Sequence, residues 1–208
     1  PLPADANHAQ ARAQPYVEAP LQLQRNAAEF YDEGTAQRTL AGLVVSCVRT
    51  ESPVHQSRVI EWVARSYGFA RVGERISEQV EHGISAAIYQ KKVIRRGDFL
   101  WRLDMMVSDT PVRVLGPGGK PRPAGAVAPE EIAAAILLAL QESFALPEEA
   151  LVVQAARYLG YERTGALVSE RLRNVIDSLC QEERVARRDG MIAQVTGSNP
   201  KRPASSAG

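Results

Sequence analysis

Apolar residues recur every three or four positions in three successive stretches, which is the spacing of one buried helix face. The first stretch covers residues 40–48 and ends before Pro53, because proline cannot continue a helix and disfavours helix in the residue before it. The second begins at Ser57, a favoured N-cap residue, and ends at Gly68, where a left-handed backbone favours glycine. The third follows Gly73, and its buried face has a spacing of four: Ile76, Val80, Ile84 and Ile88.

A short hairpin is predicted after the third helix, and the whole order of elements then recurs. Residues 93–96 and 99–103 alternate as strands around a Gly97-Asp98 turn. The hexapeptide GFARVG at 68–73 reappears as GYERTG at 160–165, and the same offset of 92 positions matches the apolar residues on both sides without a gap. This self-similarity predicts a duplicated unit.

The second copy repeats the first, element by element. Its first helix starts near Pro129, with two glutamates in the first turn, where the helix dipole favours acids. Leu146-Pro147 replaces the first proline break, and a second helix runs from about Glu148 to Gly160. A third helix follows, with apolar residues at helical spacing: Val168, Leu172, Val175, Ile176 and Leu179. A hairpin comes next, with strands at 185–188 and 191–194 around an Asp-Gly turn at 189–190.

Three helices followed by a two-stranded hairpin are typical of the winged-helix variant of the helix-turn-helix. The expected fold class is therefore mainly α with small β-hairpins (α+β), as tandem winged helix-turn-helix repeats. The alternative is a pair of small helical-hairpin repeats without a nucleic-acid role. We divide the chain into five segments: an extended N-terminal arm (1–34), a first repeat (35–103), a Pro/Gly-rich linker (104–128), a second repeat (129–195) and a disordered tail (196–208).

Charge separates the two repeats, although the whole chain has a net charge of only +1. Residues 35–103 contain eleven Lys/Arg and six Asp/Glu, whereas residues 129–194 contain seven and eleven. Winged helices place the third helix in the major groove and the wing on the DNA backbone, where Lys and Arg supply the phosphate contacts. In the first repeat the residues predicted to contact DNA are Arg71, Arg75, Gln79, His82, Lys91, Lys92, Arg95 and Arg96.

Two observations oppose this reading. Glu74, Glu78 and Glu81 lie on the same third helix and would repel phosphate, so a solvated face of mixed charge is the alternative. The second repeat is more acidic, and packing against other domains is the stronger reading for it. Arg71 and its counterpart Arg163 could equally cap helix carbonyls. The residues of the second repeat that we still include as DNA contacts are Arg163, Arg171, Arg173, Asn174, Arg187 and Arg188.

Catalytic chemistry has little support in the sequence. The three histidines, His8, His55 and His82, are scattered and have no partner at metal-ligand spacing. No nucleophile constellation and no phosphate-binding loop is present. We therefore expect no enzyme activity, no metal and no cofactor in this segment.

The cellular context is also predicted from composition. Cys47 and Cys180 fall at apolar helical positions, as small buried residues do in a reducing compartment, which favours the cytoplasm. No apolar run is long enough to span a membrane, and no signal peptide is visible. The chain begins with Pro1 and not with Met, so we expect a C-terminal piece of a longer polypeptide.

The motif Glu51-Ser52-Pro53-Val54-His55, followed by the hexapeptide at 68–73, resembles a bacterial module of unassigned function. That module lies at the C-terminal end of large superfamily 1 helicase-like proteins, often beside a Vsr-like endonuclease domain. The resemblance extends to Pro129-Glu130-Glu131-Ile132 and to the second hexapeptide, and it covers roughly residues 35–195. Members of the family usually carry Gly where Ser52 stands. The resemblance implies a non-catalytic accessory to DNA-processing machinery and carries over no catalytic residue.

Three functional hypotheses follow. The first is an accessory module that binds duplex DNA through helix three and the wing of the first repeat, beside upstream helicase and nuclease domains of the same polypeptide. The second is a protein-interaction module that packs on parent or partner domains or self-associates, with an oligomeric state that the pattern does not define. The third is a stand-alone transcription regulator.

Overall fold

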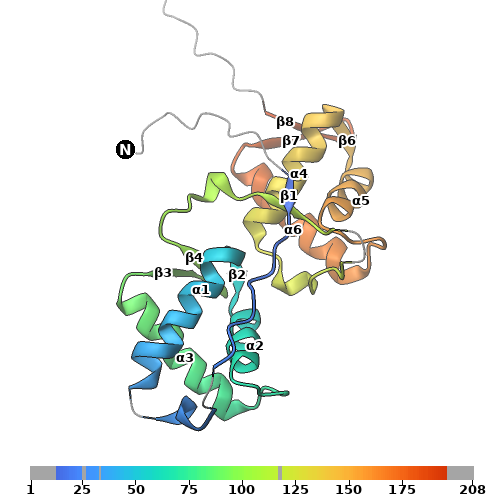
Figure 1. Ribbon diagram of the computed structural model, residues 1–208. Coiled ribbons are helices and arrows are strands. Elements are labelled where there is room, and N and C mark those ends of the chain that lie inside the picture. The colour runs from blue at the N-terminus through green and yellow to red at the C-terminus, as the bar shows by residue number, and fades with distance from the viewer. Residues whose placement is uncertain (1–12, 25–26, 33, 117–118, 196–208) are drawn as a thin grey trace, which may run out of the picture.

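The computed structural model describes residues 13–24, 27–32, 34–116 and 119–195 (Figure 1). The fold is mixed α+β, with long helices and three small sheets among the described residues. The predicted disordered tail and the first part of the predicted arm, including His8, lie outside the described residues.

The first half of the chain contains the predicted three helices and hairpin, together with short additions at its start and before its second helix. Its sheet has the order β2-β4-β3, so the two-residue strand before the second helix joins the predicted hairpin as a third strand. The elements are η1 (Ala27–Tyr31), η2 (Ala36–Leu40), α1 (Ala41–Glu51), β2 (Val54–His55), α2 (Gln56–Ser66), α3 (Glu74–Tyr89), β3 (Val93–Arg96) and β4 (Phe99–Arg102).

The second half repeats this architecture at the offset seen in the sequence. Its sheet has the equivalent order β6-β8-β7. The elements α5, α6, β7 and β8 begin and end 92 positions after α2, α3, β3 and β4. The full set is α4 (Pro129–Ser143), β6 (Ala145–Pro147), α5 (Glu148–Tyr158), α6 (Ala166–Gln181), β7 (Val185–Arg188) and β8 (Met191–Gln194).

The turns between the second and third helices have the backbone that the glycines predict. Gly68 has φ +82° and Gly160 has φ +89°, the left-handed region that glycine adopts without steric penalty. The predicted N-cap at Ser57 is wrong by two residues. The imidazole of His55 accepts a hydrogen bond from the backbone N–H of Ser57 at 3.2 Å and takes the capping role.

Each half has its own hydrophobic core, and a third cluster lies between them. The first core is built on α1, α2 and α3 around Val44, Trp62 and Ile84, and the second on α4, α5 and α6. The third cluster contains Phe99, Trp101, Met105 and Ala128. The outer face of the first sheet is therefore covered by residues that lead into the second half.

The arm and the linker bind the two halves to one another. Strand β1 (Ala13–Pro15) of the arm pairs in parallel with β5 (Val112–Val114) of the linker, as Figure 1 shows. Beyond β1 the arm follows the first half, where the indole N–H of Trp62 donates to the carbonyl of Ala19 at 3.0 Å. The linker also forms two short turns of 3₁₀ helix, η3 (Val107–Asp109) and η4 (Ala124–Ala126).

Candidate nucleic-acid interface and the junction beneath it

On α3 and the turn before it, two arginines and a histidine of the predicted interface are exposed, and the glutamine is not available. Arg71 and His82 are solvent-exposed, and the guanidinium of Arg75 lies over the ring of Tyr31, with its carbon 5.2 Å from the ring centroid. The amide of Gln79 is half-buried and donates to the carbonyl of Phe30 at 2.9 Å. The amide of Gln79 therefore already holds the segment before α1, and its role as a DNA contact stays a prediction.

The hairpin carries four exposed cations with different surroundings. Lys91 and Lys92 make no ion pair with any described residue. Arg95 forms an ion pair with Glu81 of α3 at 2.6 Å, which neutralises one of the three acids that oppose DNA binding on that helix. Arg96 lies over the indole of Trp101, 4.8 Å from the ring centroid, and keeps its charge exposed.

The back of the hairpin is braced. Trp101 is fully buried in the cluster with Met105 and Ala128, and its indole N–H has no hydrogen-bond partner among the described residues. The strand register places Arg96 opposite Phe99, next to the turn, and Val93 opposite Arg102, at the open end. Burial of Trp101 therefore packs one face of the β3–β4 hairpin against residues that follow it in the chain.

Three arginines of the second half, at the positions of Gln79, Glu81 and Arg95, have partners within the protein. Arg171 is half-buried and donates to the carbonyl of Val127 at 3.0 Å, so one of its N–H groups is already used within the protein. Arg173 binds both carboxylate oxygens of Glu149, at 2.7 and 2.9 Å. Arg187 pairs with Asp177 at 2.6 Å and with Glu148 at 3.0 Å, and the hydrogen bond to Asp177 raises the pKa of its guanidinium.

Four predicted residues of the second half are exposed to solvent, and of these Arg163, Asn174 and Arg188 form no ion pair with a described residue whereas Arg187 does. Neither Arg163 nor its counterpart Arg71 donates to a helix carbonyl among the described residues, so the carbonyl-capping alternative is wrong for both. The carbonyls at the end of α2 and α5 are satisfied instead by the backbone N–H groups of the turn that follows, including those of Gly68 and Gly160.

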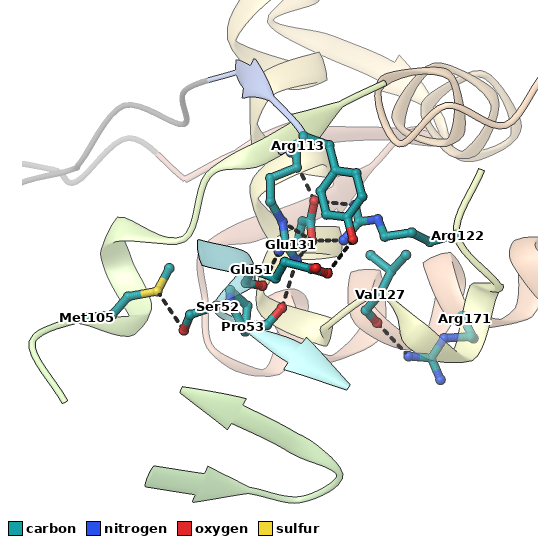
Figure 2. Close-up of polar contacts among 10 residues, drawn as sticks. Glu51, Ser52, Pro53, Met105, Arg113, Arg122, Val127, Glu131 and Arg171 are labelled. Atoms are coloured by element: carbon teal, nitrogen blue, oxygen red, sulfur yellow. Dashed lines mark hydrogen bonds and ion pairs between the residues drawn. The ribbon is translucent and has the colours of Figure 1, made fainter. Parts of the chain in front are cut away.

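The most buried polar cluster lies at the junction of the two halves, and Figure 2 shows it. Glu131 in the first turn of α4 is fully buried, and Arg113 of β5 is 4% exposed. Arg113 donates to Glu131 through its backbone N–H at 2.9 Å and through Nη2 at 2.5 Å. Arg122 adds a bidentate pair to the same carboxylate, at 2.6 and 2.8 Å.

Arg113 also reaches into the first half, which makes it the central residue of the junction. Its Nη1 donates to the carbonyl of Glu51 at 2.5 Å and its Nη2 to the carbonyl of Pro53 at 2.8 Å. Burial alone would raise the pKa of Glu131, but the hydrogen bonds and charges of Arg122 and Arg113 outweigh it and lower that pKa. Glu131 is therefore held as a carboxylate.

The side chain of Glu51 anchors the arm. Its carboxylate is almost fully buried and accepts from the hydroxyl of Tyr16 at 2.6 Å and from the backbone N–H of Ala19 at 2.8 Å. Arg58 of α2 donates to both carboxylate oxygens, at 3.1 and 3.2 Å. Burial raises the pKa of Tyr16, and the hydrogen bond to Glu51 raises it further. The arm is thus fixed to α1 and α2 by a buried charge.

Sequence reasoning missed this cluster. It explained Glu131 only as an acid at a helix start, and it gave Arg113 and Arg122 no role. One signal was available: Glu131 precedes Ala135 and Ala139 at a spacing of four, on the face that α4 buries. An acid in that pattern requires a buried cation.

Metal and membrane chemistry are not indicated by the described part of the chain. No group of three or more His, Cys, Asp or Glu residues lies close enough there to hold a metal ion. In the same residues, no helix combines the length and apolar character that a membrane crossing requires. Both cysteines are free thiols, Cys47 buried and Cys180 half-buried.

One segment of the chain matches a known protein family. The model of a family described as "protein of unknown function (DUF3320)" matches residues 28–78. This segment runs from η1 into the start of α3 and contains Glu51, Pro53 and the first glycine turn. No curated protein and no solved structure shows significant similarity to the chain.

Proposed function

We propose that the chain is a non-catalytic accessory module of a bacterial DNA-processing protein, built from two winged helix-turn-helix units. In this proposal the first unit contacts duplex DNA through α3, the turn before it and the β3–β4 hairpin. The upstream helicase or nuclease domains of the same polypeptide would be the catalytic partners. The rigid junction would hold the second unit in a fixed position beside the first.

One observation carries the proposal. Six predicted contacts of the first half keep an exposed charge or a titratable ring with no ion pair among the described residues: Arg71, Arg75, His82, Lys91, Lys92 and Arg96. Unpaired cations on a turn, a helix and a hairpin supply the phosphate contacts from which winged helices gain most of their affinity. Arg187 and Arg171 of the second half are bound within the protein, as are their counterparts Arg95 and Gln79 in the first.

Glu74 and Glu78 are exposed on α3, and they limit how the helix can approach DNA. Their charge disfavours contact along the entire helix, whereas Glu81 is neutralised by Arg95. We therefore expect the hairpin and the turn that contains Arg71 to contact the phosphates of the DNA backbone. Such binding depends strongly on salt and weakly on sequence.

The test compares two double variants that remove the same charge from equivalent positions. Arg71→Gln with Arg96→Gln alters the first half, and Arg163→Gln with Arg188→Gln alters the second. Fluorescence anisotropy with a mixed-sequence duplex at low salt measures affinity and its salt dependence. We expect the first variant to bind about tenfold more weakly and its log K–log salt slope to fall by about 2, and the second to change binding less than about twofold.

Equal effects of the two variants would mean that affinity depends only on net charge, and would contradict the assignment of the DNA contacts to the first half. Unchanged affinity in both would remove the DNA proposal. Circular dichroism of each variant guards against loss of fold, because all four side chains are exposed and their replacement should leave the secondary structure intact.

A protein-interaction module is the second candidate function, and the braced hairpin favours it. The face of Trp101 that a free wing would leave open is covered by Met105 and Ala128, as in a module whose parts already pack on one another. Size-exclusion chromatography with the separately expressed upstream domains would distinguish the two. A stable complex without any affinity for duplex DNA would favour this candidate.

A further inference from the structure

A cavity of about 360 Å³ opens in the first half, between α1 and the open end of the β3–β4 hairpin. Its apolar wall comes from Val45, Val48 and Leu103, and its cations are Arg49, Lys92 and Arg102. An apolar wall with convergent charges of one sign is the pattern of a ligand pocket. None of its cations except Lys92 belongs to the proposed DNA interface.

The cations of this cavity are incompletely satisfied. Arg49 and Lys92 form no ion pair with any described residue. Nε of Arg102 lies 3.2 Å from Oδ1 of Asp104 as an ion pair, without the geometry of a hydrogen bond. Since Asp104 is the only acid lining the cavity, three cations face one carboxylate. The excess positive charge fits an anionic ligand.

The second half shows that this charge is not required by the fold. Leu137, Gln141, Arg184 and Gln194 stand 92 positions after Val45, Arg49, Lys92 and Arg102. There the amide of Gln194 donates to the carbonyl of Leu137 at 3.1 Å, and Arg184 lies 3.6 Å from Glu182. The same place in the duplicated unit is therefore neutral and joined by a hydrogen bond across it.

We propose that this cavity binds an acidic peptide segment of a partner protein, with one apolar side chain against Val45 and Val48 and a carboxylate on Arg49 and Arg102. A protein ligand is favoured over a small anion because the apolar surface continues beyond the cavity. Leu103, Met106 and Val107, on the segment that leaves β4, are 52%, 65% and 44% exposed. The cavity lies at the opposite end of the hairpin from the Gly97-Asp98 turn.

The test uses a short peptide of alternating Glu and Leu as the probe, titrated into isotope-labelled protein and followed by backbone amide chemical shifts. We expect shifts in α1 around residues 45–49 and in residues 92 and 102–104. In the double variant Arg49→Gln, Arg102→Gln, which introduces the glutamines of the second half, the dissociation constant should rise about tenfold or more. The same loss is expected for a peptide of Gln and Leu with the unaltered protein.

The matched control is Arg157→Gln with Arg184→Gln, which removes equal charge from the second half and should leave peptide binding unchanged. Thermal unfolding of each variant checks that the fold persists. No binding of the Glu/Leu peptide, shifts elsewhere, or equal affinity of the two double variants would overturn the proposal. If Arg49→Gln, Arg102→Gln weakened binding to duplex DNA and not to the peptide, the cavity would belong to the nucleic-acid interface and the peptide site would be wrong.

Discussion

The two halves of this chain have the same helices, strands and sheet order but use their charged side chains differently. After the third helix, the first half leaves Lys91 and Lys92 without ion pairs among the described residues. In the second half Glu183 stands in place of Lys91, Arg184 in place of Lys92 pairs with Glu182, and Arg173 of α6 pairs with Glu149. Exposed side chains do not define the backbone, so a duplicated unit can keep its architecture and change its surface chemistry.

The backbone is more strictly repeated than the residues that adopt it. Lys91 and Glu183 follow the third helix in each half with φ +54° and +55°, although their charges are opposite. A left-handed non-glycine residue carries a conformational penalty, which the surrounding helix end and strand must offset. Its recurrence shows that the geometry of the connection from the third helix to the hairpin, and not the side chain, is what both halves require.

The largest expected loss of stability comes from a change at the junction, because this polar cluster lies between the two halves and is not part of the repeated unit. Glu131→Gln leaves Arg113 and Arg122 buried without a carboxylate, and removing one partner of a buried ion pair costs about 3–5 kcal/mol. Urea denaturation measures the change in unfolding free energy. Glu149→Gln is the control, because its pair with Arg173 is solvent-exposed and should be worth less than about 1 kcal/mol.

The same residue predicts an acid sensitivity. Because the folded-state pKa of Glu131 is lowered, its contribution is present above the ordinary Glu pKa of about 4.3 and is lost as the pH falls through the folded value. Unfolding free energy of the natural protein should therefore fall below that pH, with a weaker dependence in Glu131→Gln. An identical pH profile for the two proteins would contradict the assignment.

A reciprocal exchange at the third helix tests where the two halves differ in packing. A Cβ at Gly83 would lie 2.7 Å from the Cβ of Leu40, whereas the equivalent position of the second half is the half-buried Val175. Gly83→Val should cost about 3 kcal/mol or more through overpacking, and Val175→Gly about 1–2 kcal/mol through lost burial and helix propensity. Chemical denaturation gives both values, and equal costs would show that the close approach is not specific to the first half.

The two glycine turns should differ by a smaller amount. Gly68→Ala introduces a side chain at positive φ into open space, at a cost of roughly 1 kcal/mol. Gly160→Ala has the same backbone penalty, and its Cβ would also lie 2.6 Å from Cδ1 of Leu115 in the linker. We expect about 1 kcal/mol more destabilisation for Gly160→Ala, and loss of that difference when both are made in a Leu115→Ala background.

The smallest effect concerns the exposed ion pairs of the second half. Arg187→Gln removes two contacts to Asp177 and Glu148, but all three side chains are partly exposed, so stability should fall by less than about 1 kcal/mol. This loss should shrink at high salt, where such pairs are screened. A salt-independent loss would indicate packing by the arginine stem and not charge.

Much of the local structure was predictable, and the reason is visible in individual elements. The helix α3 matches the four-residue apolar spacing from Ile76, and both hairpins follow the alternation around their Gly and Asp turns. The third strand of each sheet was not identified from the sequence, because segments as short as Val54–His55 and Ala145–Pro147 do not indicate a pairing partner. The hydrogen-bond partners of Gln79 and Arg171 could not be predicted, because they come from segments far away in the chain.

The amino-acid sequence by itself determined the repeated order of helices and hairpins, since periodicity, proline breaks and glycine turns act between near neighbours. Only the tertiary structure decided how the halves are joined. Arg113 and Glu51 are 62 positions apart, and their contact exists only when β5 meets the end of α1. Whether a charged side chain is buried depends on which segments of the chain exclude water around it, and that arrangement exists only in the completed fold.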